Sequence, residues 1–341
     1  MIPLSVLDLA FVTTGTPPSA ALRNSIDLAR HADRLGYHRY WIAEHHNLPS
    51  VAIAASDILI GQIAAATLSI RVGSGGVMLP NHAPLMVAER FRTLEALFPG
   101  RIDLGLGRAP GTDGVTAVAL RRRQDRHEGD DFLERLQELV LWETGGWPAN
   151  HPFRNVLAMP SDAHLPPLYL LGSSDYSAEL AGRIGMGFAF AHHFATYDVV
   201  AAMRSYRERF QPSGWRERPL AILAIAVVCA ETERDAERLA SSMDLNWLRR
   251  SYGEYHPLPS PEEAAAYPYT EADRARMRKS RERLFVGTPQ MVEARLMPLI
   301  EATQADEVMV TSAIYDHEAR KRSYELIARH FDAGARSVAA A

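Results

Sequence analysis

Residues 70–107 read IRVGSGGVMLPNHAPLMVAERFRTLEALFPGRIDLGLG, and three segments of different character follow one another in this stretch. Ile70 to Met78 is rich in valine and glycine and is predicted to be a strand. Pro84 to Leu97 is predicted to be a helix that ends at Phe98-Pro99-Gly100, and Ile102 to Gly107 is predicted to be the next strand. A strand, a helix and a strand in this order indicate a parallel βαβ unit.

The rest of the chain repeats this alternation. Further strands are predicted at Ser5 to Val12, Tyr37 to Glu44, Leu168 to Leu171, Phe188 to Phe190, Leu220 to Cys229 and Glu307 to Thr311. Helices are predicted from Ser19, as the N-cap, to about Gly36, from about Ala52 to Ala66, from Asp130 to Trp142, from about Ser177, from Glu233 to Met243 and from His317 to Phe331. About eight strands alternating with helices predict an α/β fold, and their number favours a single (β/α)₈ TIM barrel. A doubly wound sheet has a similar periodicity and remains the alternative.

The segment from about residue 245 to 285 does not fit one βα unit, because it is long and charged. It also carries four prolines, Pro257, Pro259, Pro261 and Pro268. We expect an insertion over the C-terminal mouth of the barrel, acting either as a mobile lid or as a structural or dimer-contact excursion. Residues 1–341 are then predicted to form one barrel domain with insertions at its mouth.

Composition excludes several classes of protein. The chain has 341 residues, of which 47% are hydrophobic, so a large core can form. The net charge of -4 favours neither a nucleic acid nor an anionic membrane as a partner. The one cysteine, Cys229, lies in an apolar run and cannot form an internal disulfide. We see no signal peptide and no apolar run of ~18 residues, so a cytoplasmic protein without membrane spans is expected.

Functional groups of a barrel lie at the C-terminal ends of its strands. Four predicted strand ends carry glycine or polar residues: Glu44-His45-His46, Gly73 to His82, Gly105-Leu106-Gly107-Arg108 and Gly172-Ser173-Ser174-Asp175-Tyr176-Ser177. Because these ends meet at one mouth, we expect their side chains to form one site. Gly105-Leu106-Gly107 is not a dinucleotide-binding turn, because the third glycine of that motif would fall at position 110, which is proline.

The paired histidines suggest proton transfer more than metal binding. Neighbouring residues of a strand point to opposite faces, so His45 and His46 cannot both reach one ion, and the same holds for His192-His193. A hydrolytic metal site built from single histidines of several strands with Asp8 or Glu44 remains an alternative, but no metal is expected. One inward histidine at a barrel mouth suits general acid–base work.

Glycines and serines at the other strand ends suggest a bound cofactor. Gly73, Gly75 and Gly76 leave one wall of the barrel nearly bare, either for a flat ring or for a strand bend. Gly172-Ser173-Ser174 precedes a helix and could cradle a phosphate with Arg108 as the countercharge. The simpler reading is that Ser174 or Asp175 is only an N-cap.

Taken together, the segments resemble the bacterial luciferase-like, flavin-dependent monooxygenases, from about residue 3 to 330. The resemblance is carried by Tyr40 to His46, Gly73 to Pro84, Arg101 to Arg108 and Val286 to Pro289, in this order and spacing. It implies a (β/α)₈ barrel that binds flavin mononucleotide (FMN) at its C-terminal mouth.

The resemblance also implies roles for single residues. His45 matches the family's active-site histidine, a proton donor or acceptor near the flavin. Gly75-Gly76 matches a dipeptide that lies against the isoalloxazine ring, often through a non-proline cis bond. Arg108 matches an arginine near the phosphate, and the loop that holds the phosphate is matched by Ser173, Ser174 and Ser177.

The activity implied is that of a two-component monooxygenase. A separate NAD(P)H:flavin reductase supplies reduced FMN, and O₂ is the co-substrate for hydroxylation, epoxidation or Baeyer–Villiger oxidation of a small organic substrate, such as a secondary-metabolite intermediate. Family members are commonly dimers, so a homodimer is expected. Gly107 and His192 stand where the light-emitting catalytic chain has a cysteine and a tryptophan, which disfavours light emission. A deazaflavin-dependent dehydrogenase or reductase and a non-catalytic flavin-binding protein are the alternatives.

Overall fold

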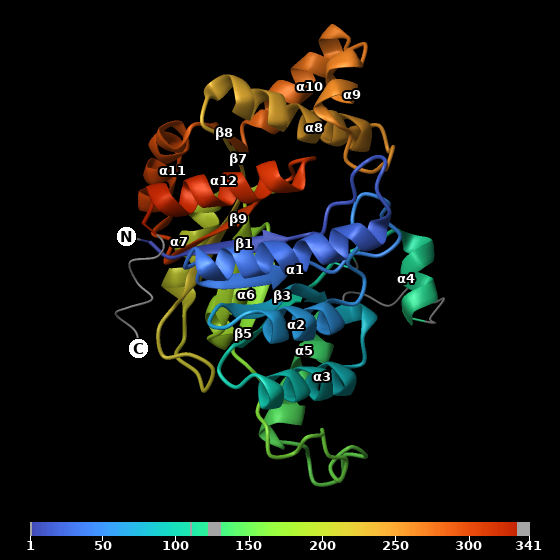
Figure 1. The fold of residues 1–341 in the computed structure, drawn as a ribbon. Coiled ribbons are helices and arrows are strands. Elements are labelled where there is room, and N and C mark those ends of the chain that lie inside the picture. Colours follow the sequence, from blue (N-terminus) through green and yellow to red (C-terminus); the bar gives the residue numbers. More distant parts are fainter. Residues whose placement is uncertain (1, 110, 122–130, 333–341) are drawn as a thin grey trace.

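Eight parallel strands close into a ring in the computed structural model, which describes residues 2–109, 111–121 and 131–332 (Figure 1). The described residues form nine strands, of which all but β8 belong to the ring: β1 (Leu4–Asp8), β2 (Arg39–Ile42), β3 (Arg71–Met78), β4 (Ile102–Gly107), β5 (Leu168–Gly172), β6 (Gly187–Ala191), β7 (Ala221–Cys229), β8 (Leu284–Gly287) and β9 (Glu307–Thr311). Each of β1 to β7 pairs with the next, and β9 pairs with both β7 and β1. This closure confirms the (β/α)₈ TIM barrel and excludes the doubly wound sheet.

All eight predicted strands are present, but β8 was missed. β8 has only four residues and lies outside the ring, because it pairs only with the second half of β7, between Ala226 and Cys229. An apolar segment of four residues is too short for its pattern to identify it as a strand. β7 is accordingly the longest strand, and its first half belongs to the barrel while its second half extends beyond it.

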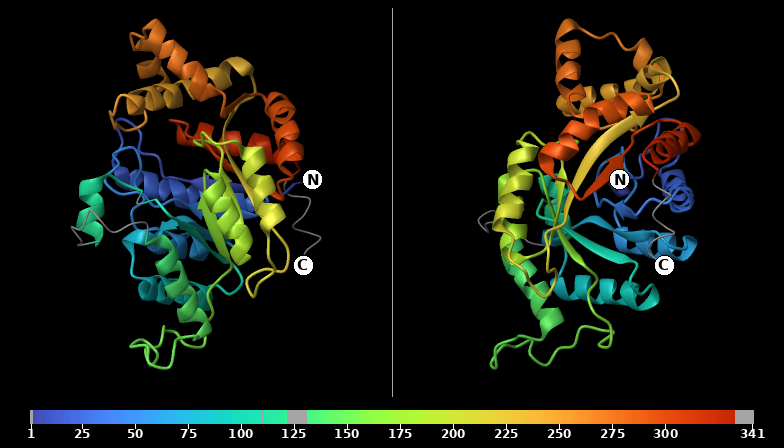
Figure 2. Two further views of the ribbon diagram at one scale, coloured as in Figure 1. Left: turned by 180° about the vertical axis from the view of Figure 1, so that it is seen from behind. Right: turned by 90° about the vertical axis from the view of Figure 1, so that its left-hand side faces the viewer.

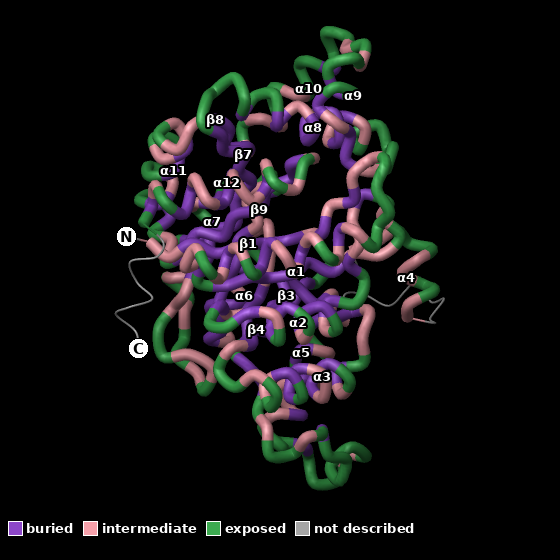
Figure 3. The backbone as a smooth tube through the Cα atoms, in the orientation of Figure 1, coloured by how far each residue is buried: buried purple, intermediate pink, exposed green. Residues whose placement is uncertain are grey.

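Helices surround the ring and leave the buried strands at the centre (Figures 2 and 3). They are α1 (Pro18–Arg34), α2 (Ser56–Ala66), α3 (Pro84–Leu97), α4 (Gly114–Arg121), α5 (Phe132–Thr144), α6 (Asp175–Ile184), α7 (Val199–Arg209), α8 (Glu233–Ser251), α9 (Pro261–Ala266), α10 (Glu271–Arg281), α11 (Pro289–Thr303) and α12 (His317–His330), with one 3₁₀ turn, η1 (Leu79–Asn81). Seven of these helices were predicted, whereas α4, α7, α9, α10 and α11 were not.

Three predicted helix ends are wrong. α1 begins after Pro17, which makes no side-chain cap bond, so Ser19 is not the N-cap. α2 begins at Ser56, because the N–H of Ala52 donates to the oxygen of Ala10 and thereby ties this stretch to the segment after β1. α8 continues past Met243 to Ser251. Asp130, the predicted start of α5, lies outside the described residues.

The inside of the barrel is filled in layers, with a polar network at the N-terminal end. Arg39 points inward from β2, and its guanidinium lies 2.7 Å from Glu307 Oε1 and 2.8 Å from Asp103 Oδ2. Above this network, Trp41 packs edge-on against Tyr169, with ring centroids 4.9 Å apart. Ion pairs and aromatic rings therefore fill the barrel at the N-terminal end of its strands, and a ligand can enter at the C-terminal end.

The insertion forms a layer of helices beside the ring (top of Figure 1). α9 and α10 each begin with a capping box, Ser260 with Glu263 and Thr270 with Asp273, which explains two short helices in so charged a segment. Arg281 of α10 pairs with Asp244 of α8 at 2.6 Å, so the helices are joined. α8 contributes side chains to the pocket at the mouth, and movement of the insertion as a lid stays a prediction.

No described helix combines the length and apolar character needed to cross a membrane.

Candidate active site

A pocket of about 420 Å³ opens at the C-terminal mouth of the barrel, a size within the range of ~300–1,000 Å³ typical of small-molecule sites. Its walls are mostly apolar and come from all eight strands of the ring and from α8. All seven residues proposed from the sequence line this one pocket: His45, Gly75, Gly76, Arg108, Ser173, Ser174 and Ser177. Segments far apart in the sequence are thus brought together at one site, and the role of each residue remains a prediction.

His45 lines the pocket and His46 does not, which agrees with the prediction that these adjacent histidines point to opposite faces. Trp41 and His45 both line the pocket, so every second residue of β2 and its extension faces inward. The N–H of His45 donates to the oxygen of Ile53 at 2.9 Å, which holds this turn of chain. Burial, aided by the nearby charge of Arg250, lowers the pKa of His45 to about 4. The imidazole is therefore neutral at neutral pH and can accept a proton.

One nitrogen of His45 is left without a bond. Nδ1 is buried and has no hydrogen-bond partner among the described residues. A buried polar atom without a partner is costly in a folded protein, so a bound molecule that satisfies it gains affinity. The Nδ1 atom of His45 can therefore form a hydrogen bond with a bound molecule.

Glu44, His46 and His82 form a cluster on the other side of this strand end. The buried Glu44 carboxylate lies 2.7 Å from His46 Nε2 and 2.9 Å from His82 Nε2, and it accepts a hydrogen bond from the N–H of Met78 at 3.0 Å. Burial opposes the charge of Glu44, but these hydrogen bonds and the His82 charge hold its pKa below the usual value. The cluster joins the ends of β2 and β3, so Glu44 and His46 support the site from behind.

Two of the three glycines predicted to leave a bare wall, Gly75 and Gly76, line the pocket, whereas Gly73 does not. The Gly75–Gly76 peptide bond is cis, and both residues line the pocket. A Cβ at Gly75 would lie 2.7 Å from Leu7 Cδ1, and one at Gly76 would lie 2.8 Å from the oxygen of Gly105. The pairing of β3 with β4 also shifts register between Ser74 and Val77, so the strand bend and the bare wall occur together. A side chain fits at neither position.

The serine loop faces the same pocket from β5 and the start of α6. Ser174 is the N-cap residue of α6, as the simpler reading predicted, but its side chain makes no cap hydrogen bond. Gly172 lies so close to Ser177 that a Cβ would meet the serine Cβ at 2.3 Å. The Arg108 guanidinium lies over the Tyr176 ring, 4.5 Å from its centroid. Hydroxyls, helix N-termini and guanidinium groups are donors that commonly bind phosphate in proteins.

The structure adds His193 and Thr311 to the pocket. His193 extends the inward alternation of β6, and the pocket is lined by His193 and not by His192, the residue singled out by the family resemblance. Burial lowers the pKa of His193 to about 4, although its Nδ1 lies 3.3 Å from the oxygen of Ala224. The Thr311 hydroxyl is buried without a partner among the described residues. Extending the alternation beyond Ala191 and to the end of β9 would have found both.

The carboxylates of the hydrolase alternative do not reach the pocket. Asp8 points outward and pairs with Arg320 at 2.7 Å, and it accepts a hydrogen bond from Tyr40. Glu44 is held by two histidines on the far side of its strand. The ligand set proposed for a hydrolytic metal is therefore not assembled.

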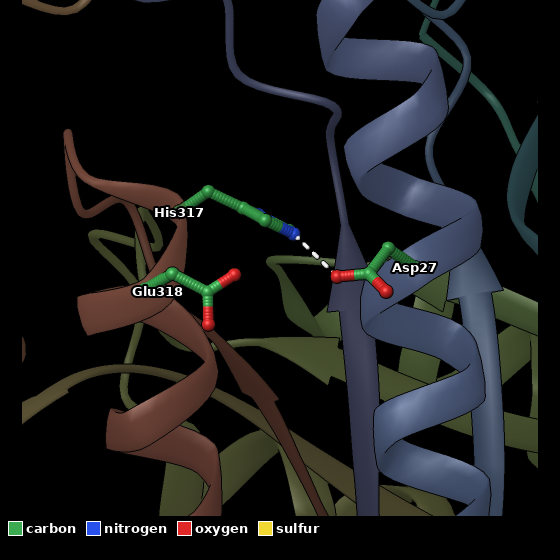
Figure 4. A group of neighbouring side chains, drawn as sticks. All are labelled: Asp27, His317 and Glu318. Carbon is green, nitrogen blue, oxygen red and sulfur yellow. Dashed lines mark hydrogen bonds and ion pairs between the residues drawn. The ribbon is translucent and has the colours of Figure 1, made fainter.

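Another group of ligating side chains lies between α1 and α12, outside the ring (Figure 4). His317 Nε2 lies 2.9 Å from Asp27. Lys321 Nζ lies 3.0 Å from Asp27 and 2.9 Å from Glu318, so both carboxylates already have a cation beside them. We interpret this group as an ion-paired contact between two helices.

A closed (β/α)₈ barrel with a pocket at the carboxyl ends of its strands is the architecture of an enzyme. The family model for luciferase-like monooxygenases matches residues 2–307. A luciferase-like monooxygenase of Escherichia coli (strain K12) is 43% identical over 325 residues, covering 95% of this chain and 96% of its own. This chain belongs to the luciferase-like monooxygenase family, and it is an enzyme, a monooxygenase of the flavin type.

Solved structures agree with this assignment. Apo-MsnO8 has a TM-score of 0.89 and 40% sequence identity and covers 98% of this chain and 100% of its own. The oxygenating constituent of 3,6-diketocamphane monooxygenase from Pseudomonas putida, a type II Baeyer–Villiger monooxygenase in complex with FMN, has a TM-score of 0.69 at 19% identity and covers 97% of each chain. The second likeness shows the fold alone. The family assignment disfavours a non-catalytic flavin-binding protein.

Proposed function

We propose that this chain is the oxygenase of a two-component system. It takes reduced FMN from a separate NAD(P)H:flavin reductase and uses O₂ to oxygenate a small organic substrate by hydroxylation, epoxidation or Baeyer–Villiger oxidation. One oxygen atom enters the substrate, and the other leaves as water with two electrons from reduced FMN. The observation that carries this proposal is one pocket with a side-chain-free wall, a phosphate-type donor set and a neutral histidine.

The pocket has residues suited to both ends of FMN, the isoalloxazine ring and the phosphate. The flat ring would lie on the wall of Gly75 and Gly76, where a Cβ has no room. The phosphate would be held by Arg108 and the hydroxyls of Ser173, Ser174 and Ser177 at the start of α6. When bound, reduced FMN supplies the electrons that activate O₂.

The chain itself excludes water and handles a proton. The apolar walls, among them Leu7, Trp41 and Met309, keep bulk water from the reacting atoms. His45 enters the reaction neutral and can accept and return one proton at a ring nitrogen. His193 lines the same pocket, also neutral, from β6. Two neutral imidazoles can each accept a proton in this pocket.

Replacing Arg108 by glutamine should weaken FMN binding without weakening riboflavin binding. A hydrogen bond to a charged group contributes roughly 1.5–3 kcal/mol, so the dissociation constant of FMN should rise about 10- to 100-fold. Riboflavin lacks the phosphate and serves as the matched ligand. Flavin fluorescence titration measures both constants. Arg183→Gln, which replaces an arginine of α6 that lies outside the pocket, is the control. An equal loss for both flavins in Arg108→Gln would contradict a phosphate role.

The proposed function is tested with a purified NAD(P)H:flavin reductase, FMN and ¹⁸O₂ over a panel of candidate substrates. We expect oxygen uptake that depends on substrate, and one labelled oxygen atom in the product. Reduction or oxidation of a substrate with a deazaflavin cofactor and no oxygen uptake would replace this function by the dehydrogenase or reductase alternative. A homodimer and a transient complex with the reductase are expected, and light scattering and cross-linking measure them.

A further inference from the structure

The pocket has a second arginine besides the one proposed for the FMN phosphate. Its described lining includes two arginines and two histidines but neither aspartate nor glutamate. Arg108 belongs to the phosphate end, beside the serine loop. The other arginine, Arg250, comes from α8 in the insertion. A second cation at a site without acidic side chains favours a second anion.

Arg250 belongs to a regular face of α8 that covers the pocket. Met243, Asn246, Trp247 and Arg250 all line it, and their spacing of three, four and seven residues places them on one side of the helix. This face changes along the helix from an apolar side chain to an amide, an aromatic ring and a cation. A ligand lying along it would meet apolar surface first and a guanidinium at its end.

The guanidinium of Arg250 is available to a ligand. It is exposed and lies over the Tyr255 ring, 6.0 Å from the centroid, and it forms no ion pair with any carboxylate of residues 2–109, 111–121 and 131–332. Arg281 of the same insertion is instead paired with Asp244 and Glu237. Arg250 and His45 line the same pocket.

We propose that this pocket takes an organic anion as its substrate, with an apolar body along Met243 and Trp247 and a carboxylate bound by Arg250. The planar guanidinium presents a pair of parallel donors that match the two oxygens of a carboxylate. Asn246, which is buried on the same face, lies beside this end of the ligand. The proposal rests on the proposed function, because it names the substrate class of the same site.

The test is equilibrium binding of a matched pair of probes, octanoate and octanamide, to the flavin-free protein by calorimetry. Octanoate should bind wild type about 10- to 100-fold more tightly than octanamide, as expected for a charge-assisted bidentate contact. Arg250→Gln should abolish the difference. Arg249→Gln, the neighbouring arginine outside the pocket, should retain it. Arg250 is exposed, so the variant should fold normally, which its thermal unfolding checks.

Three outcomes would overturn the proposal. The first is equal binding of both probes by wild type, and the second is a preference that survives in Arg250→Gln. The third is loss of the preference in Arg108→Gln but not in Arg250→Gln, which would place the anion at the phosphate end. Failure of FMN binding or of oxygen incorporation would refute the proposed function but leave the probe preference unchanged, so the two failures are distinguishable.

Discussion

Replacing His45 by alanine is expected to slow turnover by ~10²-fold or more, the loss typical of a removed general acid–base group. The neutral imidazole faces the pocket with a buried nitrogen that no described residue satisfies, and alanine has no atom that can hold a proton there. The rate under saturating reduced FMN and substrate measures this effect. FMN binding and thermal unfolding of the variant, measured alongside, separate a lost proton step from a lost site.

The matched control is His46→Gln. His46 is the adjacent residue, but it points to Glu44 and does not line the pocket, and glutamine can still donate to that carboxylate. We expect nearly normal turnover for this variant. Nearly normal turnover in His45→Ala, or equal losses in both variants, would remove His45 from the reaction.

The low pKa of His45 also predicts a pH dependence. Its pKa is about 4 in the native state and 6.5 when unperturbed, so the unfolded chain binds the proton more readily than the folded one. The free energy of unfolding is therefore unaffected by protonation of His45 above pH 6.5, and it decreases as the pH falls from 6.5 toward 4. We expect urea unfolding of wild type to show this decline, which should be smaller in His45→Gln. An identical decline in that variant would argue against a depressed pKa.

Replacing Asp103 by alanine is expected to lower the free energy of unfolding by about 3–5 kcal/mol, the cost of breaking a buried ion pair from one side. Asp103 is fully buried and pairs with both Arg39 and Arg71, at 2.8 and 2.6 Å. It also accepts a hydrogen bond from Trp41 Nε1 at 3.0 Å. Removal therefore leaves the buried Arg39 charge under-compensated and frees the ring that closes the barrel below the pocket.

Urea unfolding measures this loss, and Glu271→Ala is the control. Glu271 pairs with Arg278 on the surface, where both side chains are exposed, so its removal should change stability by less than ~1 kcal/mol. Burial opposes ionisation of Asp103, but the two arginines hold its pKa below the usual value. Its stabilising effect is therefore present at neutral pH and is lost on acidification. An Asp103→Ala variant as stable as Glu271→Ala would show that the network contributes little.

The local pattern of the chain was sufficient for most of the ring and for the key site residues. Each strand of the ring was predicted, because alternation and flanking breakers are local signals. The same period of two placed the adjacent histidines on opposite faces, and the family resemblance singled out His45 as the one in the site. Missing side chains at Gly75 and Gly76 can also be read directly from the sequence, since glycine in a strand weakens it unless something approaches closely.

Tertiary structure decided whether the ring closes and what faces His45. Closure depends on hydrogen-bonded pairing of β1 with β9, where Leu4 meets Val308, and no local period reports a contact across the whole chain. Folding of the barrel also brings His193, which follows β6, and Arg250, which lies on α8, to the mouth where His45 lies. Alternation states toward which face a side chain points, but the neighbours it meets there depend on how distant segments pack. The sequence by itself therefore determined the strands, the inward histidine and the glycines without side chains. Only the folded barrel brought them together in one pocket with a second histidine, His193, and a second arginine, Arg250.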